Sequence, residues 1–281
     1  QAEGQGAFIN VASGLDLKAT GLEAFGAVAL AGGRINLAGC SRAGNGDLTS
    51  AAVTAQGQAG LVSEVRGQGQ FHILGNLAAN DYGALDFELT DGSYFRGTAS
   101  LTDTESYNNL ALKGSSTVWE PTGDARLSSL ALDGAQVDLR STPTPTTITT
   151  DRLSGSGNFI LKTDLAASQG DLIEVTGEAH GNHVLTIANA GAADTTGAEV
   201  LTVVTAADGS AVFTLDSAVE CGAWEYNLTS LAREFNATHW QLSGTRNLTS
   251  TASGAMNVFS GAYLLLDAEN RTLRQRLGDL R

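Results

Sequence analysis

A short unit of alternating apolar and polar residues that ends in glycine recurs along this chain, and its length restricts which folds are possible. Residues 110–119 (LALKGSSTVW) and 130–139 (LALDGAQVDL) align at an offset of 20, with leucines in equivalent places and Gly114 over Gly134. Each copy reads as a short strand, a glycine turn and a second strand. A unit this short cannot bury its apolar face by itself, but stacked copies bury a continuous core.

Stacking of such units predicts an all-β fold, a right-handed parallel β-helix with coils of about 20 residues. Each strand then pairs with the equivalent strand of the coils above and below. The rival is a β-sandwich of antiparallel hairpins, because alternation and glycine turns are common to both folds. A sandwich should show tight two-residue hairpin signals throughout, and residues 1–150 show few, so we assign residues 1–150 to a β-helical stalk. Weaker copies of the unit occur at residues 28–37 and 87–95.

The composition changes at residues 141–150 (STPTPTTITT), which hold two of the three prolines. A Thr/Pro stretch favours an extended connection over a packed strand. We therefore place a candidate boundary here, between the stalk and a second module over residues 151–260.

The overall composition argues against several classes of protein. A hydrophobic content of 42% is too high for a disordered chain, and no apolar run is long enough for a membrane-spanning helix. A net charge of -14 argues against nucleic-acid binding, which needs clustered lysine and arginine. The 34 glycines and the 16% of charged residues are unlike a cytosolic enzyme. Strong acidity suits a protein that stays soluble outside the cell.

The last part of the chain, residues 263–281 (YLLLDAENRTLRQRLGDLR), is the stretch that reads clearly as an α-helix. Four leucines fall on one helical stripe, while Asp267 and Glu269 suit the helix start. Four arginines in the last eleven residues, against one acid, make this helix a basic end on an acidic body. A surface helix with solvated arginines is the alternative. The leucines of the stripe are Leu266, Leu273, Leu277 and Leu280.

Between residue 153 and the helix, four motifs follow one another in a fixed order. The first is the opening G-x-G-x-F-x-L-x-T-D of residues 155–164, and the second is GDLIEVTGEAHGNHVLTI at residues 170–187. GAWEYNL at residues 222–228 and WQL at residues 240–242 complete the set. With the ending L-x-x-R-L-G-D-L-R, this combination resembles the C-terminal part of a bacterial autotransporter passenger of the pertactin-like and AIDA-type. The ending is carried by Leu273, Arg276, Leu277, Asp279, Leu280 and Arg281, together with Gly278.

The resemblance implies a domain plan and a function. Residues 151–260 would form an autochaperone cap that nucleates folding of the passenger during type V secretion, and residues 261–281 a linker helix. That helix would lead to an outer-membrane β-barrel, the passenger's own translocator, which is absent from this chain. The passenger would be displayed at the bacterial cell surface as a non-catalytic adhesin or self-association factor. Its partners would be the host-cell surface or like passenger molecules, with no nucleic acid.

The residues themselves predict a cap, independently of the family resemblance. A solenoid end exposes an unpaired strand edge and an open core, so it needs covering. Alternation at residues 173–175 and 185–187, on either side of Gly181-Asn182, predicts an antiparallel hairpin. Large apolar side chains mark the expected folding core of the cap. They are Phe159, Leu161, Ile173, Val175, Leu185, Ile187, Phe213, Trp224, Tyr226, Trp240 and Leu242.

The two cysteines, Cys40 and Cys221, are far apart in a stack of coils. At about 4.8 Å per coil their separation of roughly nine coils is about 40 Å, well beyond the ~7 Å that a disulfide spans. We expect free thiols, with an intermolecular bridge as the alternative in an exported protein.

Signals for catalysis, metals and cofactors are weak. Glu178, His180 and His183 surround the Gly181-Asn182 turn, but this spacing does not bring ligands together well. No G-x-S-x-G nucleophile motif is present. We therefore expect no catalytic residue, metal or cofactor. Two alternatives stay open: a β-helical polysaccharide-active enzyme built on paired carboxylates, and a passive stalk for a functional domain upstream. The densest acidic group is Asp81, Asp86, Glu88 and Asp91.

Overall fold

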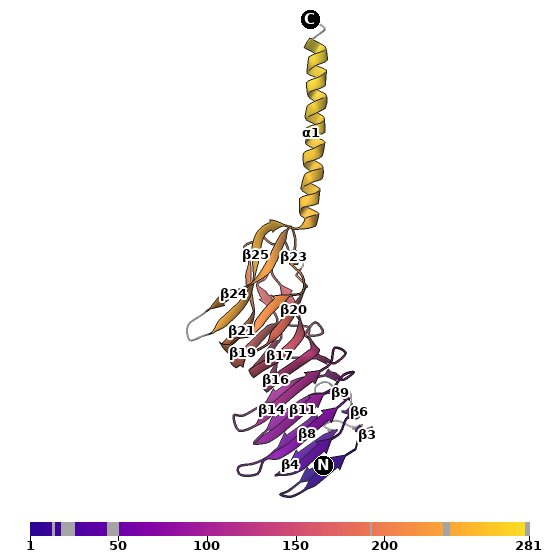
Figure 1. The fold of residues 1–281 in the computed structure, drawn as a ribbon, viewed down its shortest axis with the longest axis vertical. Coiled ribbons are helices and arrows are strands. Elements are labelled where there is room, and N and C mark those ends of the chain that lie inside the picture. Colours follow the sequence, from indigo (N-terminus) through magenta and orange to yellow (C-terminus); the bar gives the residue numbers. More distant parts are fainter. Residues whose placement is uncertain (13–14, 18–25, 44–50, 192, 233–236, 279–281) are drawn as a thin grey trace.

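The computed structural model describes residues 1–12, 15–17, 26–43, 51–191, 193–232 and 237–278. They form one elongated column of stacked coils, with a single helix projecting from its C-terminal end (Figure 1). The predicted parallel β-helix is confirmed, and the antiparallel sandwich is excluded, because the strands up to residue 150 pair in parallel with the coils before and after them.

The first face of the column runs its whole length, and each strand on it pairs in parallel with the next. Its strands are β2 (Phe8–Val11), β5 (Arg34–Leu37), β8 (Ser63–Gly69), β11 (Gly83–Leu89), β14 (Tyr107–Lys113), β16 (Ala125–Asp138), β17 (Thr147–Asp164), β19 (Leu172–Ala179) and β21 (Val200–Gly209).

The second face is also parallel, and the long strands β16 and β17 turn a corner to contribute their later halves to it. Its other strands are β3 (Leu15–Leu17), β6 (Cys40–Ala43), β9 (Phe71–Leu74), β12 (Tyr94–Arg96), β15 (Val118–Glu120), β20 (Asn182–Asn189) and β22 (Val212–Leu215).

The third face is a shorter sheet that covers only the N-terminal coils. Its strands are β1 (Ala2–Glu3), β4 (Ala27–Leu30), β7 (Ala51–Gln56), β10 (Asn76–Asn80) and β13 (Ala99–Leu101). The remaining elements lie at the C-terminal end. They are β18 (Gln169–Gly170), β23 (Val219–Cys221), β24 (Trp224–Ala232), β25 (Thr238–Leu248) and α1 (Ser250–Gly278).

The sequence repeat is a structural repeat. Leu110 lies in register with Leu130, and Leu130 with Leu153, so the leucines of successive coils form a buried ladder. Coil length is not constant, because Leu110 and Leu130 are 20 residues apart whereas Ile173 pairs with Val204, 31 residues on. The additional residues form loops between the strands, and pairing of successive coils continues beside them with local bulges, such as the one between Val175 and Glu178.

One glycine of the ladder has a packing role. A side chain at Gly67 would meet the ring of Phe87 at 2.4 Å, so the absence of a Cβ makes room for that ring in the core. Phe87 in turn packs edge-on against Phe71, with ring centroids 5.7 Å apart.

The predicted hairpin at residues 173–187 is wrong. β19 and β20 do not pair with each other: β19 lies in parallel between β17 and β21, and β20 between β17 and β22. The Gly181-Asn182 signal marks a coil corner, where Gly181 adopts φ +99° directly against Gly155. A tight corner and a hairpin turn need the same residue types, so local sequence does not distinguish them.

Parallel stacking also continues beyond the Thr/Pro stretch at residues 141–150. This stretch forms a loop and the start of β17. Apart from the short strand β18, which pairs antiparallel with the end of β17, the antiparallel pairs involve the strands that follow β22. The region beyond residue 150 therefore begins as solenoid and ends as an antiparallel sheet.

The C-terminal helix begins at Ser250, earlier than the predicted start near residues 261–263. Thr249 caps it: its side-chain oxygen accepts a bond from the Ala252 amide at 3.2 Å, and its carbonyl accepts one from Ser253 at 2.9 Å. The first turns are built of small residues without an apolar stripe, so periodicity does not reveal them. Within the described residues, no helix has the length and hydrophobicity to cross a membrane.

Candidate functional site at the C-terminal cap

The cap closes the first face of the solenoid with an antiparallel meander. β25 pairs with the outer edge of β21, β24 pairs with β25, and β23 with β24. β25 covers the edge that β21 would otherwise expose. The outermost edge at this end therefore belongs to the short hairpin of β23 and β24 and not to the solenoid. Trp240 of β25 lies opposite Val204, which belongs to the buried ladder of the first face.

Four rings form a column that joins the cap to the last coils. The ring of His183 lies 5.8 Å from that of Phe159 and 5.1 Å from that of Phe213. Phe213 packs edge-on against Trp240, with centroids 4.8 Å apart. All four side chains are buried. We name Phe159, His183, Phe213 and Trp240 the aromatic column.

His183 is part of this buried core. Its Nε2 lies 3.1 Å from the backbone oxygen of His180, and its Nδ1 is buried without a hydrogen-bond partner. Burial lowers its pKa, which the contact with His180 opposes in part, so the ring is held in its neutral form. His180 points outward and lies 3.5 Å from Glu178. In the described part of the chain, no three His, Cys, Asp or Glu residues are arranged to hold a metal ion.

A second link joins the hairpin to the loop that precedes β21. The hydroxyl of the fully buried Tyr226 donates to Glu199, which also accepts bonds from the Thr196 amide at 2.7 Å and hydroxyl at 2.8 Å. Burial opposes ionisation of Glu199, but these bonds outweigh it and lower the pKa of Glu199 to about 2. Tyr226 has a raised pKa, because of burial and of the bond to this carboxylate.

Most residues of the predicted folding core are indeed buried, but in two different settings. Leu161, Ile173, Val175 and Leu185 belong to the last coils, whereas Tyr226, Trp240 and Leu242 belong to the antiparallel cap. Ile187 and Trp224 are half-buried and pack at the margin of the core. Among the described residues, Cys221 is a free thiol; it is buried, and its sulfur accepts a bond from the Asn189 amide at 3.1 Å. The side chain of Cys40 lies outside the described part.

Asp171 has a structural role that the sequence does not signal. Its carboxylate is fully buried and accepts the backbone amides of Thr146 at 2.8 Å and Lys162 at 2.6 Å. It thereby ties the Thr/Pro loop to β17. Burial raises its pKa, against the effect of the two amides. One aspartate in a turn is common in any sequence, so only the structure distinguishes this one.

Comparison with known proteins identifies the family. A family model described as Pertactin matches residues 127–244. The chain is 32% identical over 262 residues to the probable autotransporter YcgV of Escherichia coli strain K12, covering 78% of this chain and 27% of that protein. It is 37% identical over 163 residues to the autotransporter adhesin/invasin TibA of Escherichia coli O78:H11, covering 55% of this chain and 16% of TibA.

The chain is a segment of an autotransporter passenger with a pertactin-family region. Autotransporter passengers are secreted to the cell surface. Among solved structures, the Hap adhesin of Haemophilus influenzae aligns with 84% of the passenger segment and 24% of its own chain, at 21% identity and a TM-score of 0.45. The segment spans about a quarter of the length of YcgV.

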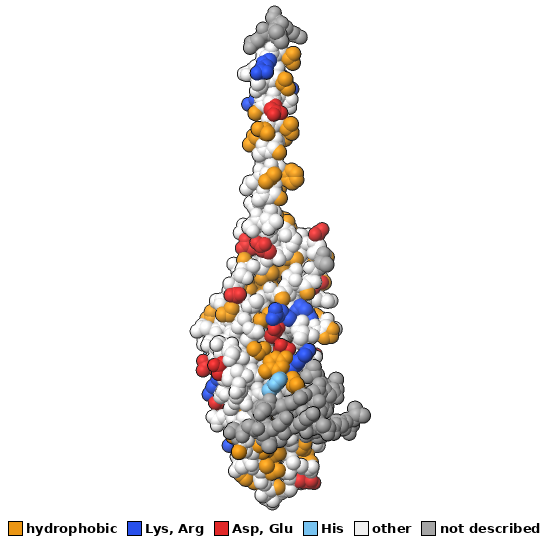
Figure 2. Space-filling model, turned by 90° about the vertical axis from the view of Figure 1, so that its right-hand side faces the viewer, with side chains coloured by type: hydrophobic (Ala, Val, Ile, Leu, Met, Phe, Trp, Pro, Cys, Tyr) orange, Lys and Arg blue, Asp and Glu red, His pale blue; other side chains and the backbone are white. Residues whose placement is uncertain are grey.

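The helix α1 projects away from the cap (Figure 1). α1 buries none of its residues, and hydrophobic side chains lie along its exposed length (Figure 2). Leu273 and Leu277 are both more than half exposed, and Arg276 lies in the last turn. Asp279, Leu280 and Arg281 lie outside the described residues.

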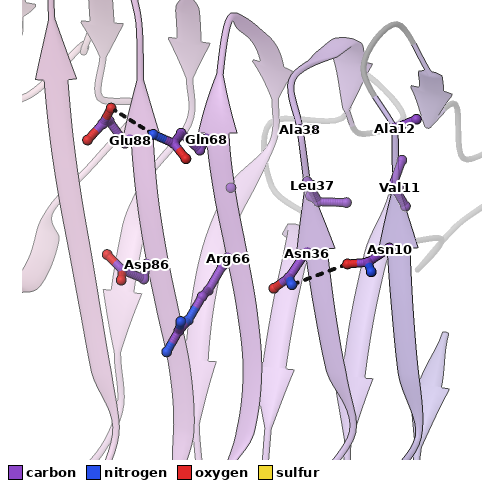
Figure 3. Close-up of a pocket in the computed structure, with 11 residues that line it drawn as sticks. Asn10, Val11, Ala12, Asn36, Leu37, Ala38, Arg66, Gln68, Asp86 and Glu88 are labelled. Carbon is purple, nitrogen blue, oxygen red and sulfur yellow. Dashed lines mark hydrogen bonds between the residues drawn. The ribbon is translucent and has the colours of Figure 1, made fainter.

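The acidic group of residues 81–91 does not converge on one site. Asp81 and Asp91 lie in turns, where Asp91 accepts the amide of Ser116 at 3.1 Å. Asp86 and Glu88 point outward from β11 into a lateral groove of about 710 Å³ on the passenger, and Glu88 is paired with Lys113 at 2.7 Å. A ladder of polar side chains lines this groove (Figure 3). The described residues of the ladder include Asn10, Asn36, Arg66, Gln68, Asp86 and Glu88.

Proposed function

We propose that this segment is a non-catalytic, surface-displayed part of an autotransporter passenger, acting as an adhesin or self-association stalk. Its C-terminal module is an autochaperone that nucleates folding, and its helix leads to the outer-membrane β-barrel of the same protein. The homology to TibA, described as an adhesin/invasin, supports the adhesive role. Within the densest acidic group, Asp91 accepts a turn amide and Glu88 is paired with Lys113, which supports a structural role for these two carboxylates.

The observation that carries the autochaperone role is the aromatic column. It places the largest side chains of the cap directly on the last coil, at Phe213 and Trp240, so that coil gains a template for stacking as soon as the cap forms. If the C-terminal end folds first during export, each coil in turn finds a completed edge on which to pair. The free energy released as each coil folds then favours movement of the passenger chain out of the cell.

Refolding kinetics of the 281-residue chain test this order of events. Trp240→Ala should raise the activation free energy of refolding by nearly as much as it lowers the free energy of unfolding, which corresponds to a φ-value near 1. The matched control is Trp119→Ala, which removes a fully buried tryptophan of the stalk stacked on Phe95 at 5.6 Å. It should mainly accelerate unfolding. The opposite ranking of the two φ-values contradicts the autochaperone proposal.

The adhesive role is tested separately. Cells that display the full passenger should aggregate or bind host cells, and deletion of residues 1–150 should reduce this binding. Unchanged adhesion after the deletion favours the passive stalk, with the active domain elsewhere in the protein.

A further inference from the structure

Two rows of outward side chains run along the first face of the N-terminal coils, across β2, β5, β8, β11, β14 and β16. Parallel register places one residue of each coil beside the equivalent residue of the next. The middle row consists of Asn10, Asn36, Arg66, Asp86, Asn109 and Ser129. The row beside it consists of Ala12, Ala38, Gln68, Glu88, Ala111 and Ala131. Figure 3 shows the first four positions of both rows.

Each row is complementary to its own reverse about a midpoint between β8 and β11. In the middle row the cation Arg66 and the anion Asp86 flank the midpoint, and asparagine or serine follows on both sides. In the other row the amide of Gln68 and the carboxylate of Glu88 flank it, and two alanines follow on both sides. A surface of this kind fits a second copy of itself across a two-fold axis, which is the requirement for a symmetric dimer. We call both rows together the self-complementary patch.

We infer that the self-complementary patch binds the same patch of a second copy of this chain, with the two columns antiparallel. This inference rests on the self-association role proposed above and names its contact surface. A two-fold axis that runs along the strands, between β8 and β11, sets Arg66 of each copy against Asp86 of the other. Gln68 of each copy meets Glu88 in the same way. Columns in parallel orientation would instead set Arg66 against Arg66 and Asp86 against Asp86, which is repulsive.

Arg66 is free to bind a second carboxylate while it keeps the one it has. Its guanidinium pairs with Glu64 of the same strand at 2.5 Å, and its side chain is 61% exposed whereas that of Glu64 is 15% exposed. A guanidinium has five N–H donors, so this pair leaves donors that point away from the sheet. The contact to Asp86 of the second copy therefore costs no ion pair within the chain.

The shape of the first face agrees with the same axis. Tyr107 is exposed at the start of β14, and the axis sets β14 opposite β5 of the second copy. Beside β5 lies a hollow of about 590 Å³ whose lining includes Phe8, Arg34 and Val62. The ring of Tyr107 can enter this hollow over the guanidinium of Arg34, in a cation–π contact, and cover the exposed Phe8 and Val62. An aromatic side chain that fills a pocket is the usual anchor of a binding interface.

The size of the patch predicts a weak pair. Strands about 4.8 Å apart give a patch roughly 24 Å long and 20 Å wide, so the two copies bury on the order of 1,000 Å² in total. This area is at the lower limit for a specific interface, and we expect a dissociation constant in the micromolar range. Many copies on one surface that meet many on another strengthen such a contact through avidity.

The orientation of the pair has a consequence for where the two copies come from. α1 leaves the column at one end (Figure 1), so an antiparallel pair places the two α1 helices at opposite ends. If each helix leads to its own outer-membrane barrel, as proposed above, the two copies belong to two facing cells. The pair then holds cells together and does not form between neighbours on one cell.

Sedimentation of the 281-residue chain tests the pairing. At about 100 µM the mean mass should rise toward twice the chain mass of 28.9 kDa. Arg66→Asp and Asp86→Arg should each weaken association roughly tenfold, because two attractive pairs become repulsive. An equimolar mixture of the two variants should associate again, since every pair across the axis then joins opposite charges, and a misfolded variant would not be rescued in this way. The matched control is Arg246→Asp on β25, outside the patch, which should associate like the unchanged chain.

Several results would overturn the inference. One is a monomer at about 100 µM, and another is association that neither charge variant weakens, as a parallel pair or a different face would give. Tyr107→Ala should also weaken association roughly tenfold, whereas Tyr107→Phe should retain most of it. A monomer that is retained on a neutral polysaccharide column, and loses this retention with Tyr107→Ala, would assign the patch to a glycan and refute the pair. Failure of the pair is distinct from failure of the adhesin proposal, which is tested by deletion of residues 1–150 in whole cells.

Discussion

Truncation of Trp240 should detach the cap from the solenoid. The side chain is 6% exposed and packs on Phe213. A buried tryptophan removes about 200 Å² of surface from water, which at about 25 cal/mol per Å² corresponds to roughly 5 kcal/mol. Partial collapse of the site reduces this value, so we expect Trp240→Ala to lower the free energy of unfolding by about 4 kcal/mol.

The location of the effect is as informative as its size. Solenoid stability is approximately a sum of repeat and nearest-neighbour terms, so damage at one end should stay local. Hydrogen exchange should therefore accelerate in β24, β25 and β22, while β8 and β11 keep their protection. The control is Leu231→Ala on the same hairpin, where the side chain is 42% exposed and the change should stay within about 0.5 kcal/mol. A loss below about 1 kcal/mol for Trp240→Ala, or uniform loss of protection along the column, would refute the reasoning.

Three further outcomes follow from individual contacts. The folded-state pKa of Glu199 is lowered to about 2, so its contribution to stability should be complete above the unfolded value near 4.5 and vanish as pH falls toward 2. Tyr226→Phe should reduce this acid dependence of the free energy of unfolding in denaturant melts. An unchanged pH profile would contradict the role of the Tyr226–Glu199 bond. Asp171→Asn should lower the free energy of unfolding by roughly 1–3 kcal/mol, because one of the two buried backbone amides that now donate to the carboxylate would face an NH₂ group. An unchanged melting temperature would contradict the anchoring role of Asp171. Gly181→Ala should lower the free energy of unfolding by more than about 3 kcal/mol, because its Cβ would lie 1.8 Å from the Gly155 oxygen. The control is Gly60→Ala, at a similar φ but in open space, which should lower it by only about 1 kcal/mol. Equal losses for the two variants would rule out the packing explanation.

The stacking of the coils was predictable from sequence because it depends on periodic apolar residues. Leu110 and Leu130 occupy equivalent positions in the repeat and adjacent positions in the ladder, because the two strands pair in register from Asn109–Ser129 to Leu112–Leu132. The change from parallel to antiparallel pairing was not predictable in this way. β19, β20, β24 and β25 all alternate, and alternation reports which face of a strand is buried, not which strand lies beside it.

The site was predictable in part for the same reason. Trp240 and Phe213 are large and apolar, so a buried role was foreseeable from composition. His183 is polar and lies near His180, which suggests a ligand; its place between two aromatic rings depends on the pairing of β20 with β17 and β22. The anchoring role of Asp171 likewise arises from two chain segments that meet only in the folded coil.

The two faces of the solenoid are closed at this end by different forces. On the first face, β25 completes the edge of β21 through backbone hydrogen bonds, which depend little on side-chain identity. On the second face, β22 pairs in parallel with β20, and its Phe213 packs on Trp240 of the cap. Sequence changes in the cap should therefore be tolerated along β25 as long as the strand is kept, but not at Trp240, whose ring supplies the packing on Phe213 of the second face. The aromatic column is for this reason the part of the cap on which a templating role for the preceding coils depends.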